Sequence, residues 1–446
     1  MFKAEEIYAS FGIKKESSLE IKRIVTDSRK ADKDSLFVAI IGENMDGHNF
    51  IASALEKGCP IVVASRIPEG VDEEKIILVE DTRDALLKIA GLYRRKFSIP
   101  LVGITGSVGK TTTREFVSLV MKKKFKLLKN EENLNNEIGV SDTLFRLDES
   151  YGASCMEMGM DGLGQIEKIS TACYPQIAVI TNIGISHLEK LGSRENILKA
   201  KTEILKPMDK GSPLIICKDN DLLCNYENPD HRIISYGIKN KDADVRAENI
   251  EVKGTATTFD VIAPFGNFPC TIPTVGEHNV LNALAAFCVG NLLGISNEDM
   301  ADALSNYESV GLRQKLMEKD NIKYVADCYN ASPDSLMAAA KALSSMKTEG
   351  KKYMVVSDML ELGSDEEELH RNCGKEMAEM DIDAVLGTGR LTKCLIDGVN
   401  NKKEAHHFSD KDSLAEFIGK VRQENDIYWL KASRGMKLED ILEKLL

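Results

Sequence analysis

Residues 101–113 read L-V-G-I-T-G-S-V-G-K-T-T-T, and this stretch decides the fold of the domain that contains it. An apolar run leads into a glycine-bearing turn, and the turn opens a helical pattern that continues to Lys124. At such a junction the backbone N–H groups point inward and bind phosphate oxygens, and glycine lets the chain approach the ligand closely. The stretch therefore predicts an α/β domain that binds a nucleoside triphosphate.

Side chains at the end of this turn would complete the phosphate site. Lys110 would place a positive charge on the β- and γ-phosphates, and Thr111 would offer a hydroxyl to Mg²⁺. The glycine spacing departs from the strict Walker pattern, which has glycine where this chain has Ile104. The alternative is a glycine turn that only joins a strand to a helix, but G-K-T-T after a clear strand favours nucleotide binding. We expect nucleotide contacts from Gly106, Ser107, Gly109, Lys110, Thr111 and Thr112.

The composition excludes several classes of protein. The chain has 446 residues, of which 43% are hydrophobic and 29% charged, as in a globular protein with domains of roughly 100–200 residues. Its formal net charge is −12, so it carries no electrostatic footprint for nucleic acid. An anionic ligand must therefore bind in a small pocket with local donors or cations.

The cysteines and the apolar runs indicate the compartment. Ten cysteines are scattered between Cys59 and Cys394 without a C-x-x-C pair, so neither a zinc site nor a disulfide framework is expected. The first twelve residues lack the apolar core of a signal peptide, and no apolar run reaches the roughly 18 residues of a membrane-spanning helix. We expect a cytoplasmic protein, a monomer that does not insert into membranes.

The hydrophobic pattern divides the chain into three α/β domains. Strand-like runs at 35–40 and 59–65 alternate with a helical run in the first block, residues 1–97. The second block, residues 98–310, has buried parallel-strand runs at 153–159 and 175–184, a β-rich region at 213–273 and a long apolar helix at 279–294. The third block, residues 311–446, has strand-like runs at 321–329, 351–359, 383–389 and 426–433. We predict a small α/β N-terminal domain, a central P-loop domain of doubly wound ATPase type and a C-terminal Rossmann-like domain.

A series of motifs along the whole chain resembles the Mur ligase family, whose members join amino acids or peptides to UDP-N-acetylmuramic acid. The run T-G-S-V-G-K-T-T resembles the nucleotide loop of that family. Further matches follow in the family's order, namely TDSRK (26–30), DGHNF (46–50), NLNNEIG (133–139), EMG (157–159), TNIGISHLEKLGS (181–193), KAKTEIL (199–205), GEHNVLNALAA (276–286), DCYNASPDSL (327–336), DMLELG (358–363) and KASRGMKLE (431–439).

The resemblance implies ATP-driven formation of an amide bond. The set is most similar to the members that attach D-alanyl-D-alanine to UDP-N-acetylmuramoyl-tripeptide in peptidoglycan precursor synthesis. A carboxylate would attack the γ-phosphorus of ATP, and an amine would then displace phosphate from the acyl phosphate. Such phosphoryl transfer needs positioning and charge neutralisation, which Lys110 and Mg²⁺ would supply.

The resemblance also implies the metal ligands and catalytic residues. Glu157 ends a predicted strand and would bind Mg²⁺ together with Thr111, although it could be an ordinary surface carboxylate. His187 would help to hold a second ion, although a lone loop histidine is usually structural. In the family the lysine that matches Lys201 is carbamylated, which converts a cation into a carboxylate-like ligand. Lys199 is a competitor for that role, and alignment with A-K-x-E favours Lys201.

Contacts to the adenosine and to the other substrates follow from the same motifs, and each could instead be a cap or a turn residue. The residues expected to bind the nucleotide are His278, Asn279, Asn282, Arg313, Asp327, Tyr329 and Asn330. The residues expected at the uridine diphosphate are Ser28, Arg29, Asp46, Gly47 and His48. Asn135 and Asn136 are expected on the muramoyl-peptide arm. The residues expected to hold the dipeptide are Asp358, Lys431, Ser433 and Arg434.

Five positions carry a residue other than the family's commoner one. They are Ser141, Thr202, Ser332, Ser357 and Ala432. Two alternatives therefore stay open: a Mur-like ligase with diverged substrates, and a P-loop protein that binds ATP as a switch without ligation. The switch would not need Glu157, His187 and Lys201 together.

Overall fold

The computed structural model describes residues 1–42, 44–399 and 402–446. The chain divides into two compact units, each of which is assembled from separate stretches of sequence. The first unit comprises residues 1–104, 125–178 and 202–212. The second comprises residues 105–124, 179–201 and 213–446.

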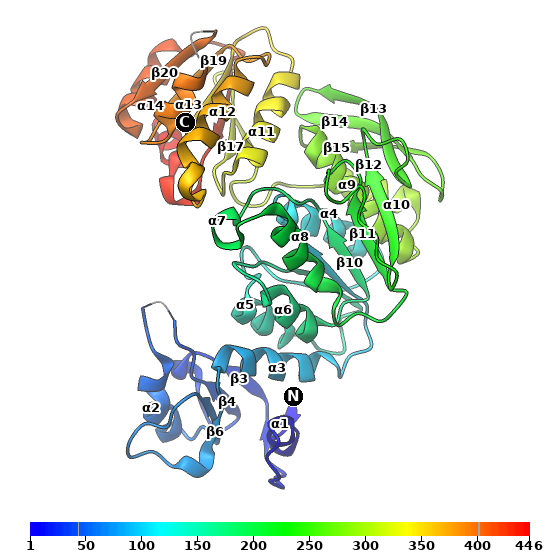
Figure 1. The fold of residues 1–446 in the computed structure, drawn as a ribbon, viewed down its shortest axis with the longest axis vertical. Coiled ribbons are helices and arrows are strands. Elements are labelled where there is room, and N and C mark those ends of the chain that lie inside the picture. Colours follow the sequence, from blue (N-terminus) through cyan, green and yellow to red (C-terminus); the bar gives the residue numbers. More distant parts are fainter. Residues whose placement is uncertain (43, 400–401) are drawn as a thin grey trace. The chain divides into compact units, whose positions relative to one another are not determined.

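The N-terminal part of the first unit is built on a four-stranded parallel sheet in the order β3-β4-β5-β6. Strands β4 and β5 are S-L-F-V and I-V-V-A, and both are buried throughout because the sheet is covered. Helix α2 packs its Ile51 and Ala54 against Phe37 and Val62 of the sheet (Figure 1). The elements are β1 (Phe2–Lys3), α1 (Ala4–Ser10), β2 (Glu20–Ile21), β3 (Arg23–Val25), β4 (Ser35–Val38), α2 (Ile51–Glu56), β5 (Ile61–Ala64), β6 (Ile76–Leu78) and α3 (Thr82–Arg94).

The rest of the first unit brings three parallel strands together in the order β7-β9-β8. Strands β7 and β9 are fully buried, which explains their continuous apolar runs. The elements are β7 (Leu101–Thr105), β8 (Leu127–Lys129), α5 (Glu137–Leu144), β9 (Ala153–Glu157) and α6 (Gln165–Cys173).

The second unit begins with the helix that follows the glycine turn and continues into a β-rich region. Strands β11 and β12 are parallel, whereas β13, β14 and β15 form an antiparallel meander. Helix α9 is apolar on nearly every face, as expected of a helix that is buried on most sides, and it packs on α4. The elements are α4 (Lys110–Lys122), β10 (Ile177–Ile180), α7 (Leu188–Leu191), α8 (Arg194–Thr202), β11 (Pro213–Cys217), β12 (Arg232–Gly237), β13 (Val245–Lys253), β14 (Ala256–Ile262), β15 (Phe268–Ile272), α9 (Glu277–Leu292) and α10 (Asn297–Ser305).

The C-terminal part of this unit is a six-stranded sheet in the order β16-β17-β21-β18-β19-β20, with β16 antiparallel at one edge. Alternate residues of its strands enter two separate cores, one under α11, α12 and α13 and the other under α14 and α15. Helices thus cover both faces (Figure 1). The elements are β16 (Lys315–Lys319), β17 (Ile322–Asp327), α11 (Pro333–Ser345), β18 (Lys352–Ser357), α12 (Glu366–Met377), β19 (Ala384–Thr388), α13 (Thr392–Val399), β20 (Glu404–Phe408), α14 (Lys411–Val421), β21 (Ile427–Lys431) and α15 (Leu442–Leu445).

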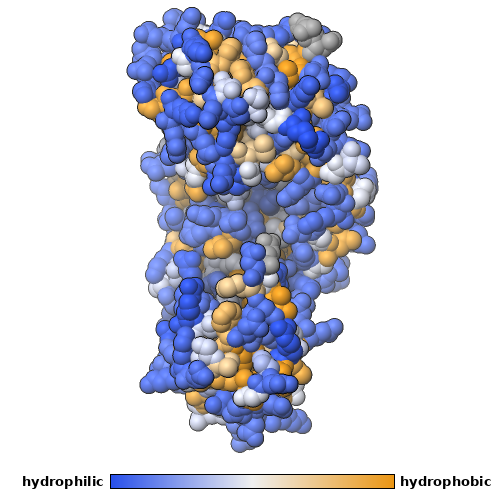
Figure 2. All heavy atoms as spheres, turned by 90° about the vertical axis from the view of Figure 1, so that its left-hand side faces the viewer, coloured by the Kyte–Doolittle hydropathy of each residue, from blue (hydrophilic) through white to orange (hydrophobic). Residues whose placement is uncertain are grey.

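The α/β class predicted from the sequence is confirmed, and each predicted strand run contains an observed strand. The domain boundaries at residues 97/98 and 310/311 stay predictions. Hydrophilic side chains cover most of the face drawn in Figure 2. Among the described residues, no helix is both long and apolar enough to cross a bilayer.

Candidate active site

The glycine turn between β7 and α4 has the backbone shape of a phosphate loop. Gly106 has a φ of 152° and Gly109 has a φ of 80°, backbone conformations that residues other than glycine rarely adopt. A Cβ atom on Gly106 would lie 1.8 Å from the Oγ1 of Thr181. Lys110 is the first residue of α4, so the predicted lysine stands at the helix N-terminus, where anions bind.

The segment after β10 holds this loop in place. The backbone N–H groups of Ser107 and Val108 donate to the side-chain oxygen of Asn182, at 3.2 and 3.0 Å. Thr181 Oγ1 donates to the Val108 carbonyl at 2.7 Å, and the N–H of Gly184 donates to Ser107 Oγ at 2.9 Å. Sequence reasoning did not single out Asn182, although it lies in the motif T-N-I-G directly after a buried strand.

Lys110 folds back over the loop that precedes it. Its ammonium group donates to the carbonyl oxygens of Gly106 and Ser107, at 2.8 and 3.2 Å. The cation is therefore held at the loop rather than extended into solvent. Thr111 is buried on the same first turn of α4, and Thr112 is half-buried.

Lys201 lies within the interior and near Lys110. Its side chain is 1% exposed. Burial, together with the positive charge of Lys110, holds the pKa of the Lys201 amine well below its usual range. A neutral amine is nucleophilic, which an ordinary surface ammonium is not.

The loop that carries His187 contacts the C-terminal part of the chain. His187 itself is in the left-handed conformation with φ 65° and caps α7. Two residues earlier, the N–H of Ile185 donates to the carboxylate of Asp334 at 3.2 Å. A Cβ atom on Gly184 would lie 2.1 Å from that carboxylate and 3.3 Å from Ser107 Cβ, so only glycine fits between them. Asp334, at the start of α11, was not among the predicted residues.

In the first unit, Glu157 lies at the carboxyl end of β9 and is 2% exposed. Its Oε1 accepts a hydrogen bond from the side chain of Asn135 at 2.8 Å, so two predicted residues meet here. The buried Asn130 makes two hydrogen bonds to the backbone of Glu157, both at 2.9 Å. Asn136 caps α5 by accepting from the N–H of Gly139. The placement of Glu157 beside Thr111, His187 and Lys201 stays a prediction, because those three residues belong to the other unit.

The polar residues at the start of α9 form a connected network with the phosphate loop helix. Asn282 accepts from Thr113 Oγ1 at 3.0 Å and donates to Asn279 at 3.3 Å. Asn279 in turn donates to the side-chain oxygen of Gln314 at 2.9 Å, and Gln314 Nε2 lies 2.6 Å from His278 Nε2. Burial lowers the pKa of His278 to about 4, so the ring is neutral. Gln314 follows the predicted Arg313 and was missed by sequence reasoning.

The predicted nucleotide residues of the C-terminal part pair with one another and with Lys431, which was predicted to hold the dipeptide. The Arg313 guanidinium stacks over the ring of Tyr329 at 3.9 Å, which gives a flat cationic surface of the kind that a base can cover. Lys431 forms a buried ion pair with Asp327 at 2.9 Å and donates to the carbonyl of Asn330 at 2.7 Å. Lys431 and Asp327 end the neighbouring strands β21 and β17, so both project at the carboxyl edge of the sheet.

Asp358 and Ser433, predicted to hold the dipeptide, support the loop that follows β18. Asp358 is buried, and its Oδ1 accepts from the N–H and the hydroxyl of Thr392, both at 2.8 Å, at the start of α13. Ser433 Oγ accepts from the N–H of Leu360 at 3.0 Å. Arg434 is largely exposed and pairs with Glu439.

The predicted uridine diphosphate residues gather at the carboxyl edge of the N-terminal sheet. Ser28 and Arg29 follow β3, and Arg29 pairs with Asp27, whose pKa it lowers to about 2. The side chain of Arg29 is 87% exposed, so it is available to an anion. Gly47 packs closely on the backbone of Ile40, where a Cβ atom would be 2.7 Å away.

Asp46 and His48 form a network in which the histidine ring has no free nitrogen. His48 Nδ1 lies 2.7 Å from Asp46, and its Nε2 accepts from the N–H of Ser65 at 2.9 Å. Since His48 is 1% exposed, it shapes the loop rather than reaching a ligand. Asp46 also pairs with Arg66, an exposed cation at the end of β5 that sequence reasoning missed. Arg66 holds the pKa of Asp46 far below its usual range.

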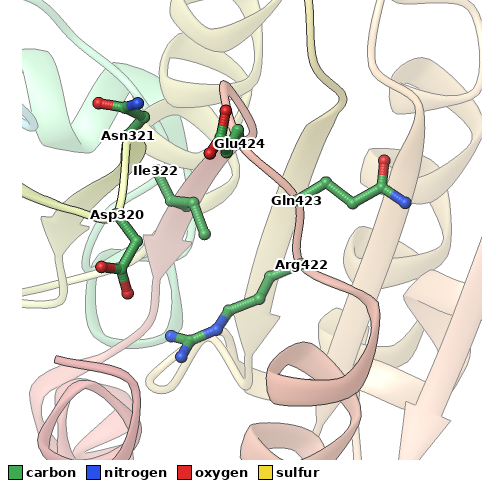
Figure 3. A pocket seen from close by; sticks show the side chains of 6 residues that line it. All are labelled: Asp320, Asn321, Ile322, Arg422, Gln423 and Glu424. Carbon is green, nitrogen blue, oxygen red and sulfur yellow. The ribbon is translucent and has the colours of Figure 1, made fainter.

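The described residues hold no cluster of three or more His, Cys, Asp or Glu side chains that would bind a metal by themselves. A pocket of about 440 Å³ in the C-terminal part lies elsewhere (Figure 3). The pocket lies at the edge of the sheet where β17 and β21 begin, and it is lined by Asp320, Ile322 and Arg422. Asp327 and Lys431 lie at the opposite edge, where these two strands end. In Figure 3 the Gln423 side chain points away from Arg422 and Asp320. The pocket is therefore separate from the candidate site.

The chain matches three family models. They are "Mur ligase family, catalytic domain" at residues 20–94, "Mur ligase middle domain" at residues 104–290 and "Mur ligase, glutamate ligase domain" at residues 312–434.

Relatives and solved structures agree with these matches. The chain is 36% identical to a Bacillus subtilis UDP-N-acetylmuramoyl-tripeptide–D-alanyl-D-alanine ligase, with 96% of this chain and 93% of the relative covered. It is 30% identical to the Escherichia coli enzyme of that name, with 96% and 94% covered. A crystal structure of MurF from Acinetobacter baumannii has a TM-score of 0.90 at 29% identity, and covers 100% of this chain and 98% of its own. MurF ligase from Thermotoga maritima in complex with ADP has a TM-score of 0.86 at 28% identity, with 96% and 98% covered.

Proposed function

The chain belongs to the Mur ligase family, and from this premise we propose that it joins D-alanyl-D-alanine to UDP-N-acetylmuramoyl-tripeptide at the expense of ATP. It would act in the cytoplasm as a monomer, in the synthesis of the peptidoglycan precursor. The similarity to the Bacillus subtilis and Escherichia coli UDP-N-acetylmuramoyl-tripeptide–D-alanyl-D-alanine ligases covers 96% of the chain, and it supports the assignment of both substrates.

One observation carries the nucleotide part of this proposal. The turn from Gly106 to Gly109 is a phosphate loop, pinned from behind by Thr181 and Asn182, with the ammonium group of Lys110 held over it. Such a loop neutralises the β- and γ-phosphates of ATP. The same helix start offers Thr111, and Lys201 lies close enough for the charge of Lys110 to lower its pKa.

The reaction then proceeds in two steps. The terminal carboxylate of the tripeptide attacks the γ-phosphorus of ATP, and the bond from that phosphorus to the β–γ bridging oxygen breaks. The products are an acyl phosphate and ADP, which departs with the bridging oxygen. The neutral amine of D-alanyl-D-alanine attacks the acyl carbon, the amide bond forms, and inorganic phosphate leaves while the amine loses its proton. In both steps the role of Lys110 is to neutralise charge that moves onto phosphate oxygens.

Mg²⁺ would supply charge neutralisation to the phosphates, and it prefers oxygen donors of the kind that Thr111 and Glu157 carry. Thr111, Glu157 and His187 would hold the ions, together with Lys201 once it is carbamylated. The buried Lys201 amine fits that modification, because a neutral amine can attack CO₂. The carbamate would replace a neutral buried amine with an anion that a metal stabilises.

Substrate contacts are assigned to the edges where the candidate residues lie. The Arg313–Tyr329 stack, with Asp327 and Asn330, would receive the adenosine. The exposed Arg29 would bind the uridine diphosphate at the edge shaped by Ser28, Gly47 and the Asp46–His48 pair. Asn135, beside Glu157, would contact the peptide arm. The His278, Asn279 and Asn282 network would act indirectly, by holding the start of α4.

Phosphate release by the purified protein tests this function. We expect release with ATP, Mg²⁺, UDP-N-acetylmuramoyl-tripeptide and D-alanyl-D-alanine together, and a background level when either acceptor or dipeptide is omitted. Release that is unaffected by omission of the dipeptide would reject ligation and leave ATP hydrolysis. The condensed product, detected by its mass, must appear in proportion to the phosphate.

A further inference from the structure

The loop of Asp358–Leu360, directly after β18, is held by a buried histidine that none of the candidate motifs contains. We propose that His370, on α12, is a positioning residue that fixes this loop in the shape that receives the incoming dipeptide. The inference rests on the proposed function for the identity of the substrate. Its structural basis lies wholly within the C-terminal part of the second unit.

Both ring nitrogens of His370 have a partner. Nε2 accepts a hydrogen bond from the N–H of Met359 at 3.0 Å, and Nδ1 donates to the carbonyl of Glu366 at 2.6 Å. The side chain is completely buried. A buried backbone N–H that loses its acceptor is costly, so this contact constrains the loop strongly.

The residues on either side of Met359 are tied to other elements. Asp358 is bonded to Thr392 at the start of α13, and the N–H of Leu360 donates to Ser433 after β21. Three consecutive residues are thus anchored to three separate elements, α12, α13 and the segment after β21. The central anchor depends on the side chain of a histidine.

The loop presents a small apolar surface next to a cation. Leu360 is 43% exposed, and its Cδ1 would lie 3.1 Å from a Cβ atom on Gly435. Arg434 is the neighbour of Gly435 and has an exposed guanidinium group. A short peptide with methyl side chains and a terminal carboxylate matches an exposed leucine beside an arginine. Misplacement of the loop would therefore weaken binding of the dipeptide more than binding of the other substrates.

The protonation state of His370 determines whether the anchor holds. Burial is the largest effect on the pKa of the ring and lowers it, and the charge of Arg390 lowers it further. The Glu366 carbonyl, the Asp358 carboxylate and the Glu366 carboxylate raise it, but by less. The ring is therefore neutral at neutral pH, with Nε2 as the acceptor. When it is protonated at acid pH, Nε2 becomes a donor that faces the donating N–H of Met359, and the anchor is lost.

Substitution kinetics test the proposal. In His370→Gln the amide oxygen can still accept from Met359, whereas in His370→Leu nothing can. We expect His370→Leu to raise the KM for D-alanyl-D-alanine by about tenfold or more, with the KM for ATP changed by less than about twofold. His370→Gln should stay within about threefold of the native KM. His406→Gln, at an exposed histidine, is the matched control. It should leave the KM values for D-alanyl-D-alanine, ATP and UDP-N-acetylmuramoyl-tripeptide unchanged.

The pH profile supplies an independent readout. The KM of the native enzyme for the dipeptide should rise relative to that of His370→Gln as the pH falls below the ordinary histidine range, because only the native side chain can become protonated. Equal KM values for His370→Leu and the native enzyme, equal increases for every substrate, or a constant native-to-Gln ratio across pH would each overturn the proposal. Should His370→Leu fail to fold, the pH comparison with His370→Gln decides. Failure of the proposed function would look different, because the native protein would then show no dipeptide-dependent turnover.

Discussion

Replacement of Gly106 with alanine is expected to disable the phosphate loop by a steric mechanism that the structure specifies. The added Cβ would lie 1.8 Å from Thr181 Oγ1, whereas real Cβ atoms essentially never come within 3.0 Å, so the loop must move by more than 1 Å. Overpacking of this kind costs about 1–3 kcal/mol. The φ of 152° adds strain of about 1–3 kcal/mol for any residue with a side chain.

The expected loss can be converted into nucleotide affinity. The clash and the strain together cost about 2–6 kcal/mol, which the loop avoids when it leaves its binding shape. Since each 1.4 kcal/mol corresponds to a tenfold change in Kd, the Kd for the nucleotide should rise by at least roughly 30-fold. Titration calorimetry with Mg·ADP measures this directly. Gly211→Ala is the matched control, because Gly211 also has a positive φ of 83° but no atom within 4 Å of the added Cβ. It should leave the affinity within about twofold of the native value.

A second substitution separates the clash from the strain. Thr181→Ala removes the Oγ1 and leaves the Cβ of that residue as the nearest atom, at 3.0 Å. Alone it should weaken binding modestly, since the hydrogen bond to Val108 is lost. In combination with Gly106→Ala it should restore affinity by about fivefold or more, a coupling energy of about 1 kcal/mol. Native affinity in Gly106→Ala, or an equal loss in the native and Thr181→Ala backgrounds, would rule out the steric mechanism.

Three further perturbations test other parts of the account. Lys110→Ala should lower kcat by at least about 10³-fold through loss of the charge over the loop, and undiminished turnover in a coupled ADP assay would contradict its role. Lys201→Ala should be inactive but partly rescued by acetate or formate, which can take the place of the carbamate; full activity without these anions would count against the modification. Ser332→Ala should destabilise α11 by about 1 kcal/mol, because Ser332 caps this helix, and should lower the thermal midpoint, whereas Ser332→Asn should not.

The strands that sequence analysis located share one property, burial on both faces. Strands β4, β5, β7, β9, β18 and β21 are apolar runs covered by helices, and continuous hydrophobicity identifies them. Strand β16 was missed, because it is the exposed antiparallel edge and reads K-L-M-E-K. Strand β20 was missed for the same reason, since it is mostly polar and lies at the opposite edge. Edge strands owe their structure to a neighbour that the local sequence does not reveal.

The candidate site divides in a similar way. The glycine pattern predicted the turn at Gly106–Gly109, because the φ values of these two residues are ones that glycine adopts readily. Asn182, Asn130 and Gln314 could not be found in the same way, because each acts by holding a backbone or a side chain that is distant in sequence. A lone asparagine or glutamine carries no pattern that reveals such a partner. Supporting residues therefore emerged only from the three-dimensional structure.

Some positions that depart from the family pattern have a clear local explanation. Ser332 caps α11 as asparagine would. Ser357 Oγ donates to the carbonyl of Thr388 at 2.6 Å, and Ser141 Oγ donates to that of Glu137 at 2.7 Å. These hydroxyls are satisfied within the fold, so the substitutions do not require altered substrates. The methyl group of Ala432 is fully buried in the core under α14 and α15.

Transfer of oxygen from the acceptor to phosphate is the most direct test of the central claim, that the loop at Lys110 activates an acid for coupling to an amine. The terminal carboxylate of UDP-N-acetylmuramoyl-tripeptide would be labelled with ¹⁸O, and the phosphate released during ligation would be analysed by mass spectrometry. We expect each phosphate formed from a carboxylate labelled at both oxygens to carry one ¹⁸O atom, because the oxygen that attacks the γ-phosphorus leaves with it. Unlabelled phosphate, formed while the amide product accumulates, would contradict activation through an acyl phosphate.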